Sequence, residues 1–148
     1  MNLPDNFDPL SLDNQLCFAL YVCSKEIIRR YKPLLDPLNL TYTEYITLMS
    51  LWEKDDVTVK ELGQRLFLDS GTLTPLLKKM EKQNLLTRRR STEDERTVYI
   101  KLTSEGKAMH NKCKEIPAKM SCCGFIDMKK APDLMETLHQ IMNTISVQ

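Results

Sequence analysis

Glycine is scarce in this chain: four of its 148 residues are glycine, and none stands in a GxGxxG or GxxxxGKS/T string. Such strings bring backbone N–H groups close to phosphates, so no nucleotide-binding loop is expected. No apolar run approaches the roughly 20 residues that a membrane-spanning helix needs. Residues 1–5 lack the basic patch and apolar stretch of a secretory signal. We therefore expect a cytoplasmic protein with no membrane partner and with reduced thiols.

Histidine is also scarce, with two residues, and the carboxylates are scattered, so no Ser/His/Asp set or similar constellation can be assembled. The five cysteines form an odd set without a CxxC pair, which argues against a disulfide scaffold. A zinc site from His110, Cys113, Cys122 and Cys123 is conceivable, but its spacing matches no common zinc pattern. We expect no enzyme, no metal and no other cofactor, while a working thiol stays open.

Length and composition are those of an ordinary globular chain. A chain of 148 residues suffices for one domain, and 42% hydrophobic with 28% charged residues suggests neither disorder nor a membrane class. Lys and Arg number 21 against 20 Asp and Glu, so the net charge is only +1. Any binding to nucleic acid must therefore come from a local basic patch.

At both ends of the chain, apolar residues recur every three or four positions, which is the period of a helix packed along one stripe. The first stripe runs from Ser11 to Tyr31, with Asp13 in its first turn, and Pro33 limits its continuation. A last stripe begins at Ala131. Both are longer than one small core can cover, so we expect them to pair with a second copy of the chain.

The middle of the chain has the pattern of a helix-turn-helix. Thr-x-x-Glu capping boxes at Thr41 and Thr58 predict the starts of two helices. Turn residues follow at 68–71, and the next helical stripe places Pro75 in its first turn, where its missing N–H costs nothing. Two short helices joined by a tight turn are thus predicted.

A β-hairpin follows this helix pair. Apolar and polar residues alternate over 86–90 and again over 98–102, with the charged tip 91–96 between them. Thr103 or Ser104 then caps another helix.

These elements predict a mainly α protein with a minor β part. It is a winged helix-turn-helix whose N- and C-terminal helices form a homodimerisation lobe. Residues 1–40 form the N-terminal dimerisation helix, 41–103 the winged lobe, and 104–148 the C-terminal dimerisation helices.

A basic patch lies across the winged lobe. Between Thr72 and Arg90 stand six basic side chains and one acid, Glu81, so this segment carries a charge of +5. A charge run is often only a solvated face, but its position beside a helix-turn-helix and a hairpin is typical of a DNA-binding surface. Hydroxyls near the start of the second helix can contact base edges or phosphates. The candidates are Ser70, Thr72, Thr74, Lys78, Lys79, Arg88 and Arg90.

Six segments together carry a resemblance to a known family. They are 12–21 (LDNQLCFALY), 31–35 (YKPLL), 40–42 (LTY), 68–78 (LDSGTLTPLLK), 90–96 (RSTEDER) and 102–106 (LTSEG). The last three resemble the MarR family of winged-helix regulators, and the first three resemble its branch of organic-hydroperoxide resistance regulators. The resemblance implies a homodimeric repressor on pseudo-palindromic double-stranded operator DNA, with organic hydroperoxide as its inducer.

The resemblance also implies roles for single residues. Cys17 is the sensing thiol, and Tyr31 and Tyr42 are the phenols that hold it, with Tyr42 coming from the other subunit. Arg96 is the wing residue that enters the minor groove, and Asp94 braces it.

The chemistry of such a thiol can be examined on the residues themselves. A sensing cysteine must be a thiolate at neutral pH, and an ordinary thiol with a pKa of about 8.5 needs a helix N-terminus, a cation or hydrogen bonds for this. Cys17 lies within two turns of the predicted helix start, where the dipole contributes weakly. Tyr31 is about 21 Å farther along a straight helix, so a phenol must reach the thiol from a bent helix or from the partner chain.

The second half of a thiol switch stays open. In some relatives a sulfenic acid condenses with a C-terminal cysteine of the other subunit, and in others a small thiol caps it. Cys122 and Cys123 are candidates for the resolving cysteine, and buried packing is their alternative. Two rival functions also stay open. One is a regulator that a small ligand triggers, in which Cys17 is inert. The other is a thiol peroxidase that uses Cys17.

Overall fold

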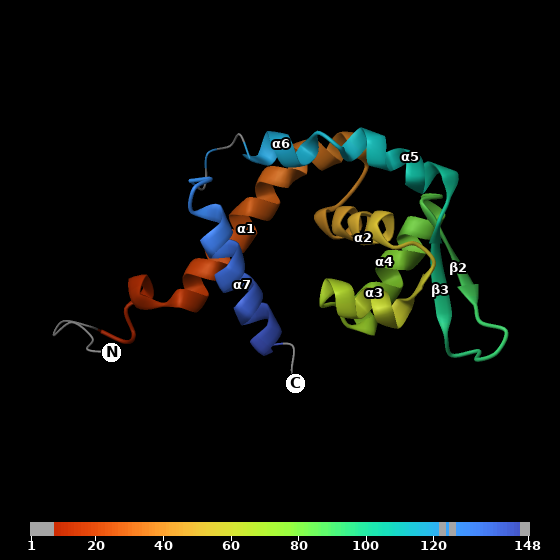
Figure 1. The fold of residues 1–148 in the computed structure, drawn as a ribbon, viewed down its shortest axis with the longest axis horizontal. Coiled ribbons are helices and arrows are strands. Elements are labelled where there is room, and N and C mark those ends of the chain that lie inside the picture. The colour runs from red at the N-terminus through yellow and green to blue at the C-terminus, as the bar shows by residue number, and fades with distance from the viewer. Residues whose placement is uncertain (1–7, 122–123, 125–126, 146–148) are drawn as a thin grey trace. The chain divides into compact units, whose positions relative to one another are not determined.

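A computed structural model describes residues 8–121, 124 and 127–145 of the chain. Its described part is mainly helical with one three-stranded antiparallel sheet, as the sequence predicts (Figure 1). The chain forms two compact units, one ending at Tyr42 and the other beginning at Thr43. The three-part division at residues 40 and 103 stays a prediction.

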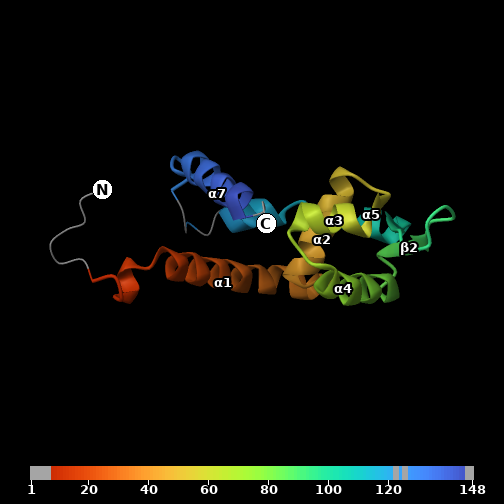
Figure 2. The same ribbon diagram turned by 90° about the horizontal axis from the view of Figure 1, so that it is seen from below.

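The first unit is built on one long helix. A 3-10 turn, η1 (Leu12–Asn14), is followed by extended Gln15, and then by α1 (Leu16–Leu35) and a second 3-10 turn, η2 (Asp36–Leu38). The prediction of a single helix from Ser11 was therefore wrong, because the extended backbone of Gln15 interrupts it. Figure 2 shows α1 without interruption.

Two further expectations about this helix were wrong. Asp13 belongs to η1 and not to the first turn of α1. Pro33 lies inside α1, which continues to Leu35. A proline inside a helix removes the backbone N–H that would bond the carbonyl four residues earlier, here that of Arg29, and the buried side chain of Leu35 packs the turn that follows.

The second unit begins with the predicted helix pair. The elements are α2 (Tyr42–Glu53), β1 (Val57–Thr58), α3 (Val59–Leu66) and α4 (Ser70–Lys82). The capping box at Thr58 is confirmed, since its hydroxyl accepts from the N–H of Glu61 while Glu61 accepts from Thr58. Asp69 caps α4 by accepting from the N–H of Thr72. Because α4 begins at Ser70, Pro75 lies in its second turn, and the prediction of the first turn was wrong.

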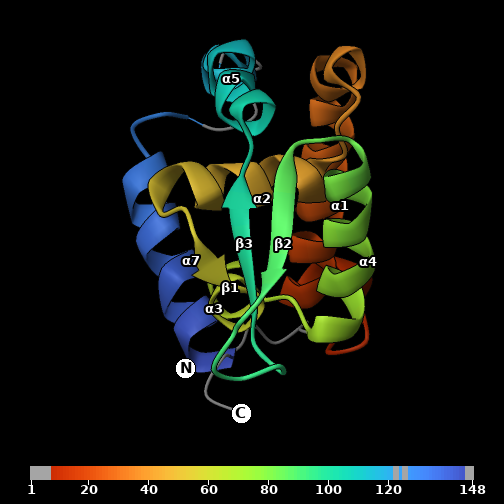
Figure 3. The same ribbon diagram turned by 90° about the vertical axis from the view of Figure 1, so that its right-hand side faces the viewer.

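The hairpin is confirmed. Strands β2 (Leu86–Arg90) and β3 (Val98–Leu102) pair antiparallel, with Leu86 opposite Leu102 and Arg90 opposite Val98. The short β1 pairs with the other edge of β3, so the strand order is β1-β3-β2 (Figure 3).

The core of this unit lies between the helix pair, the sheet and α2. Helix α4 buries one stripe of apolar side chains, and the sheet buries alternate residues, as their periods require. The side chains with 1% exposure or less are Leu48, Leu51, Leu62, Leu73, Leu77, Met80, Leu86 and Ile100.

The chain ends in three helices, α5 (Ser104–Cys113), α6 (Ile116–Ser121) and α7 (Ala131–Ile145). Thr103 caps α5 by accepting from the N–H of Gly106, which settles the choice between Thr103 and Ser104. No described residue of α7 is buried, although the helix carries Leu134, Met135, Met142 and Ile145. Within the described ranges, no helix has the length and apolarity to cross a membrane.

Candidate nucleic-acid interface and sensor thiol

Helix α4 presents one exposed stripe of predicted DNA-binding residues. Ser70, Thr74 and Lys78 follow one another at intervals of four positions, so each is turned by about 40° from the one before. All three side chains are exposed. The buried stripe of Leu73, Leu77 and Met80 is centred about 90° away around the helix, so the exposed stripe borders the face that packs into the core.

The other two candidates on α4, Thr72 and Lys79, lie about 180–200° around the helix from Ser70. Both have partners in the chain. The hydroxyl of Thr72 donates to the Asp69 carboxylate at 2.9 Å, as part of the helix cap. The Lys79 ammonium lies 2.9 Å from a carboxylate oxygen of Glu44, a side chain with 0% exposure. A role of these two residues on DNA stays a prediction, and the structure assigns each a contact within the protein.

Arg88 is held in a fixed orientation by Glu81. Its Nε donates to one carboxylate oxygen at 2.8 Å, and its backbone N–H donates to the other oxygen at 3.0 Å. These bonds from Arg88 lower the pKa of the Glu81 carboxyl. The single acid of the basic segment therefore orients one of its arginines. By contrast, Arg90 is exposed, and no described residue forms an ion pair with it.

The wing between the strands is organised by Asp94. Its carboxylate accepts from the backbone N–H of Arg96 at 3.0 Å and from the hydroxyl of Thr97 at 2.9 Å. The backbone N–H of Thr97 also donates to the Asp94 carbonyl. Asp94 thus holds the backbone on which Arg96 stands, and it leaves the guanidinium exposed.

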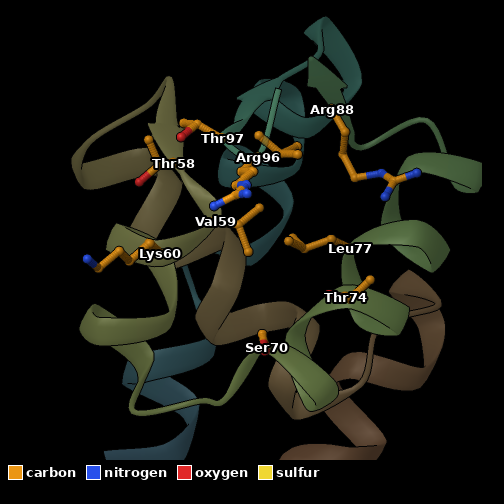
Figure 4. Close-up of a pocket in the computed structure, with 10 residues that line it drawn as sticks. Thr58, Val59, Lys60, Ser70, Thr74, Leu77, Arg88, Arg96 and Thr97 are labelled. Atoms are coloured by element: carbon orange, nitrogen blue, oxygen red, sulfur yellow. The ribbon is translucent and has the colours of Figure 1, made fainter. Parts of the chain in front are cut away.

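Four of the predicted residues come together around one hollow of about 480 Å³: Ser70 and Thr74 from α4, Arg88 from β2 and Arg96 from the wing (Figure 4). Lys60 lines it as well, at the second residue of α3. None of the ten lining residues that Figure 4 draws is acidic. The hollow therefore joins three basic side chains with the hydroxyl-bearing Thr58, Ser70, Thr74 and Thr97, a set that suits a phosphate backbone.

The sequence reasoning missed Lys60. A signal was present, because a lysine in the first turn of a helix stands where the helix dipole disfavours a cation. Lysine at such a position points to an anion outside the helix.

Cys17 is the second residue of α1, and its side chain is exposed. The prediction placed it up to two turns from the helix start, and the break at Gln15 corrects this. The first turn is the part of a helix where unpaired N–H groups and the dipole favour a negative charge. The structure therefore places the Cys17 side chain closer to the N-terminal end of its helix than the sequence indicated.

Tyr31 and Tyr42 contact one another. Their ring centroids are 4.9 Å apart, with an angle of 55° between the ring planes. Burial raises the pKa of both phenols above the ordinary value of 10.0, and Tyr42 raises that of Tyr31 further. Both rings therefore stay protonated at neutral pH and can donate hydrogen bonds.

The straightness of α1 decides how these phenols can reach the thiol. Cys17 and Tyr31 are fourteen residues apart on an unbroken helix, which corresponds to about 21 Å along its axis. Tyr31 therefore cannot touch Cys17 of its own chain, and Tyr42 lies against Tyr31. That Tyr42 comes from the other subunit stays a prediction, and because the two rings touch, a partner that supplies Tyr42 supplies Tyr31 as well.

The remaining cysteines differ from one another. Cys23 is exposed on α1, whereas Cys113 is buried and its desolvation raises the pKa of its thiol. Cys122 and Cys123 lie outside the described residues. His110 packs edge-on against the Trp52 ring at 5.1 Å, and no cluster of three or more metal-ligating side chains occurs among residues 8–121, 124 and 127–145.

Comparisons with known proteins agree on one class. The family model "Transcriptional regulator SarA/Rot" matches residues 29–116, more than half of the chain. An organic hydroperoxide resistance transcriptional regulator of Bacillus subtilis is 50% identical over 145 residues, which cover 93% of this chain and 99% of that protein. The HTH-type transcriptional regulator SarZ of Staphylococcus aureus is 45% identical over 132 residues, 89% of each chain.

Solved structures of the protein AbfR are also similar. Reduced AbfR bound to DNA has a TM-score of 0.76 and 32% identity, covering 90% of this chain and 94% of the other. An overoxidised form bound to DNA and a disulfide form of AbfR have TM-scores of 0.74 and 0.60, at 31% and 30% identity.

Proposed function

The chain belongs to the MarR family of winged-helix transcriptional regulators, in its branch of organic-hydroperoxide resistance regulators, and from this premise we propose its specific action. It is a redox-sensing repressor that binds pseudo-palindromic operator DNA as a homodimer and leaves it when an organic hydroperoxide oxidises Cys17. The observation that carries this proposal is the exposed thiol at the second residue of α1, in a chain whose two protonated phenols form a pair.

On DNA, the stripe Ser70, Thr74 and Lys78 of α4 lies in the major groove. Arg88 and Lys60 contact the phosphate backbone beside it, and Arg96 reaches the minor groove from the wing. The ion pair with Glu81 and the hydrogen bonds of Asp94 hold the hairpin in the conformation that such contacts need. As a DNA-binding regulator, the protein acts in the cytoplasm.

A second copy of the chain completes the sensor. The apolar side chains of α1 and α7, exposed in the single chain, pair with the same helices of the partner. In this dimer, the Tyr31 and Tyr42 pair of one subunit donates hydrogen bonds to the Cys17 thiolate of the other. A thiolate that accepts hydrogen bonds from two protonated phenols is more stable than a thiolate surrounded by apolar groups.

The chemical step is a two-electron oxidation of sulfur. The thiolate attacks the outer oxygen of the hydroperoxide, the O–O bond breaks, and the alkoxide leaves and takes up a proton as an alcohol. The product is a sulfenic acid on Cys17. A second thiol then displaces water to form a disulfide, and Cys122 and Cys123 are the candidates within the chain.

The oxidised sulfur no longer accepts the two phenol hydrogen bonds as a thiolate does, and its new substituent needs space. The phenols and the start of α2 shift, and the two α4 helices of the dimer change their separation. Operator half-sites lie about 34 Å apart for a protein of this class, so a changed separation weakens binding.

The test compares the wild type with Cys17→Ser, and with Cys23→Ser as the matched control on the same helix. Fluorescence anisotropy with a labelled operator measures binding before and after one equivalent of cumene hydroperoxide, and intact mass reports the sulfur. We expect Cys17→Ser to bind DNA and ignore the peroxide, while Cys23→Ser responds like the wild type. Release of Cys17→Ser by peroxide would refute the proposal.

A ligand-triggered regulator is the second candidate. A hollow of about 400 Å³ in the first unit is lined by the apolar Ile28, Leu35 and Leu40 and by Lys25, Arg29 and the Lys32–Asp36 ion pair, a size and lining that suit a small aromatic ligand. If peroxide leaves both the mass and the DNA affinity of the wild type unchanged, this candidate takes first place.

A further inference from the structure

Helix α2 carries an unusual side chain. Among the described residues, the polar side chains that are buried are Glu44 and Thr47, both with 0% exposure and both on α2. The Thr47 hydroxyl donates to the carbonyl of Thr43 one turn earlier, which satisfies it locally. Glu44 is different, because removing a carboxylate from water is costly unless a cation or hydrogen bonds compensate it.

The compensating cation comes from another helix. Lys79, near the C-terminal end of α4, places its Nζ 2.9 Å from a carboxylate oxygen of Glu44. The side chain of Lys79 is 54% exposed, so a partly exposed cation meets a fully buried anion. This bond ties the third residue of α2 to the helix that we assign to the major groove.

The same turn of α2 carries a sensor residue. Tyr42 is the first residue of α2 and contacts Tyr31, and Glu44 follows two positions later. Two positions on an α-helix correspond to a rotation of about 200°. The phenol and the carboxylate therefore leave the first turn of α2 on opposite sides, one toward Tyr31 and one toward Lys79.

From this arrangement we propose that Glu44 and Lys79 are positioning residues that couple the state of the Cys17 sensor to the placement of α4. The inference rests on the proposed function and deepens it. When oxidation displaces the phenol of Tyr42, the first turn of α2 moves, and the ion pair carries this movement to α4. A purely apolar contact would let α4 slide, whereas a buried charge holds one partner at one distance.

The pair also gives Lys79 a role other than the predicted one. A phosphate-binding lysine contributes to the salt dependence of DNA binding, with a change of about 0.9 in the slope of log K against log salt for each phosphate contact. Lys78, one position earlier, is exposed and forms no ion pair with a described residue. We expect Lys78 to contribute to that slope and Lys79 to contribute little.

The experiment uses the full-length dimer with operator DNA and four variants. These are Glu44→Gln, Lys79→Met, the conservative Lys79→Arg and the control Lys78→Met. For each, the operator Kd is measured before and after oxidation by cumene hydroperoxide, at several salt concentrations. The ratio of the oxidised to the reduced Kd is the readout, because a residue that only stabilises the fold leaves it unchanged.

In Glu44→Gln and in Lys79→Met we expect this ratio to fall by a factor between about two and about thirty, the range found when one member of a coupling network is removed. Lys79→Arg keeps the cation and retains the ratio. Lys78→Met binds DNA more weakly and with a smaller salt slope, but its ratio stays at the wild-type value.

If Glu44→Gln and Lys79→Met both keep the wild-type ratio of oxidised to reduced Kd, the inference is overturned while the proposed function stands. If the wild type itself keeps its operator after Cys17 is oxidised, as seen by intact mass, the proposed function fails first. Lys79→Met removes the cation beside a buried carboxylate, so thermal unfolding checks each variant. If it does not fold, Glu44→Gln and the double variant Glu44→Gln/Lys79→Met decide the matter, because neither has that charge.

Discussion

Helix α1 and helix α4 carry similar apolar stripes but satisfy them differently. In the 13 residues of α4, Leu73, Leu77 and Met80 are buried against the rest of the second unit. In the 20 residues of α1, only Leu35 is buried, and Leu16, Leu20 and Tyr21 have 36% exposure or more. A stripe that the chain itself does not cover must be covered by something else. The second unit thus covers the apolar stripe of α4 by itself, whereas in the proposed dimer a second copy covers that of α1.

The same contrast holds for charges. On α4 and the hairpin, Lys79 and Arg88 are oriented by Glu44 and Glu81. On α1, the ion pairs of Glu26 with Lys25 and Arg29 are long and that of Lys32 with Asp36 is short, but all are exposed, and such pairs contribute little. The guanidinium of Arg88 is therefore oriented before DNA arrives and Lys79 is engaged within the protein, whereas the exposed pairs of α1 fix no side chain in this way.

The largest effect is expected from a charge on the α1 stripe. Leu20→Glu would place an unpaired carboxylate in the proposed dimer interface, at a cost of several kcal/mol. We expect a monomer by analytical ultracentrifugation and an operator affinity reduced at least about a hundredfold. The control Lys25→Glu adds the same side chain on the opposite side of α1 and should remain dimeric. If Leu20→Glu is still a dimer, α1 is not part of the dimer interface.

An intermediate effect is expected in the core of the second unit. Leu77, with 1% exposure, packs inside it, and Leu77→Ala should lower the free energy of unfolding by about 2–5 kcal/mol through lost burial and the cavity left behind. Chemical denaturation followed by circular dichroism measures this loss. Leu16→Ala, at 66% exposure, is the matched variant of α1. Its loss should grow smaller as the protein is diluted and the dimer dissociates. If both variants lose the same free energy of unfolding at every protein concentration, the proposed difference between α1 and α4 is wrong.

The smallest effect concerns the phenol pair. Because the folded protein raises the pKa of Tyr31 and Tyr42 above 10.0, it disfavours their ionisation relative to the unfolded chain. Their contribution to stability is present in full below pH 10.0 and is lost as the pH rises through the raised values. Denaturation between pH 9 and pH 12, roughly the range in which tyrosine titrates, measures this loss. The variant Tyr31→Phe/Tyr42→Phe should lose less stability over that range, and an equal loss would contradict the raised pKa values.

The local part of the fold could be predicted from sequence because its causes are local. Capping at Thr58 and alternation over β2 and β3 depend on residues within a few positions of one another, and the structure confirms both. The break at Gln15 could not be predicted, since the apolar period continues through it. The spacing of apolar residues indicates which face of a helix is apolar. It does not indicate whether every backbone hydrogen bond of that helix forms.

The sequence by itself determined the class of protein, the layout of the winged lobe and the thiol at the start of the chain. Only the tertiary structure decided which charged side chains pair with one another inside the protein. Glu44 lies 35 positions from Lys79, and Glu81 lies across a turn from Arg88. The linear pattern counts Lys79, Glu81 and Arg88 in one charged segment and leaves Glu44 outside it. Whether a lysine faces water, DNA or a buried carboxylate depends on distances and burial, which arise only when separate helices pack together.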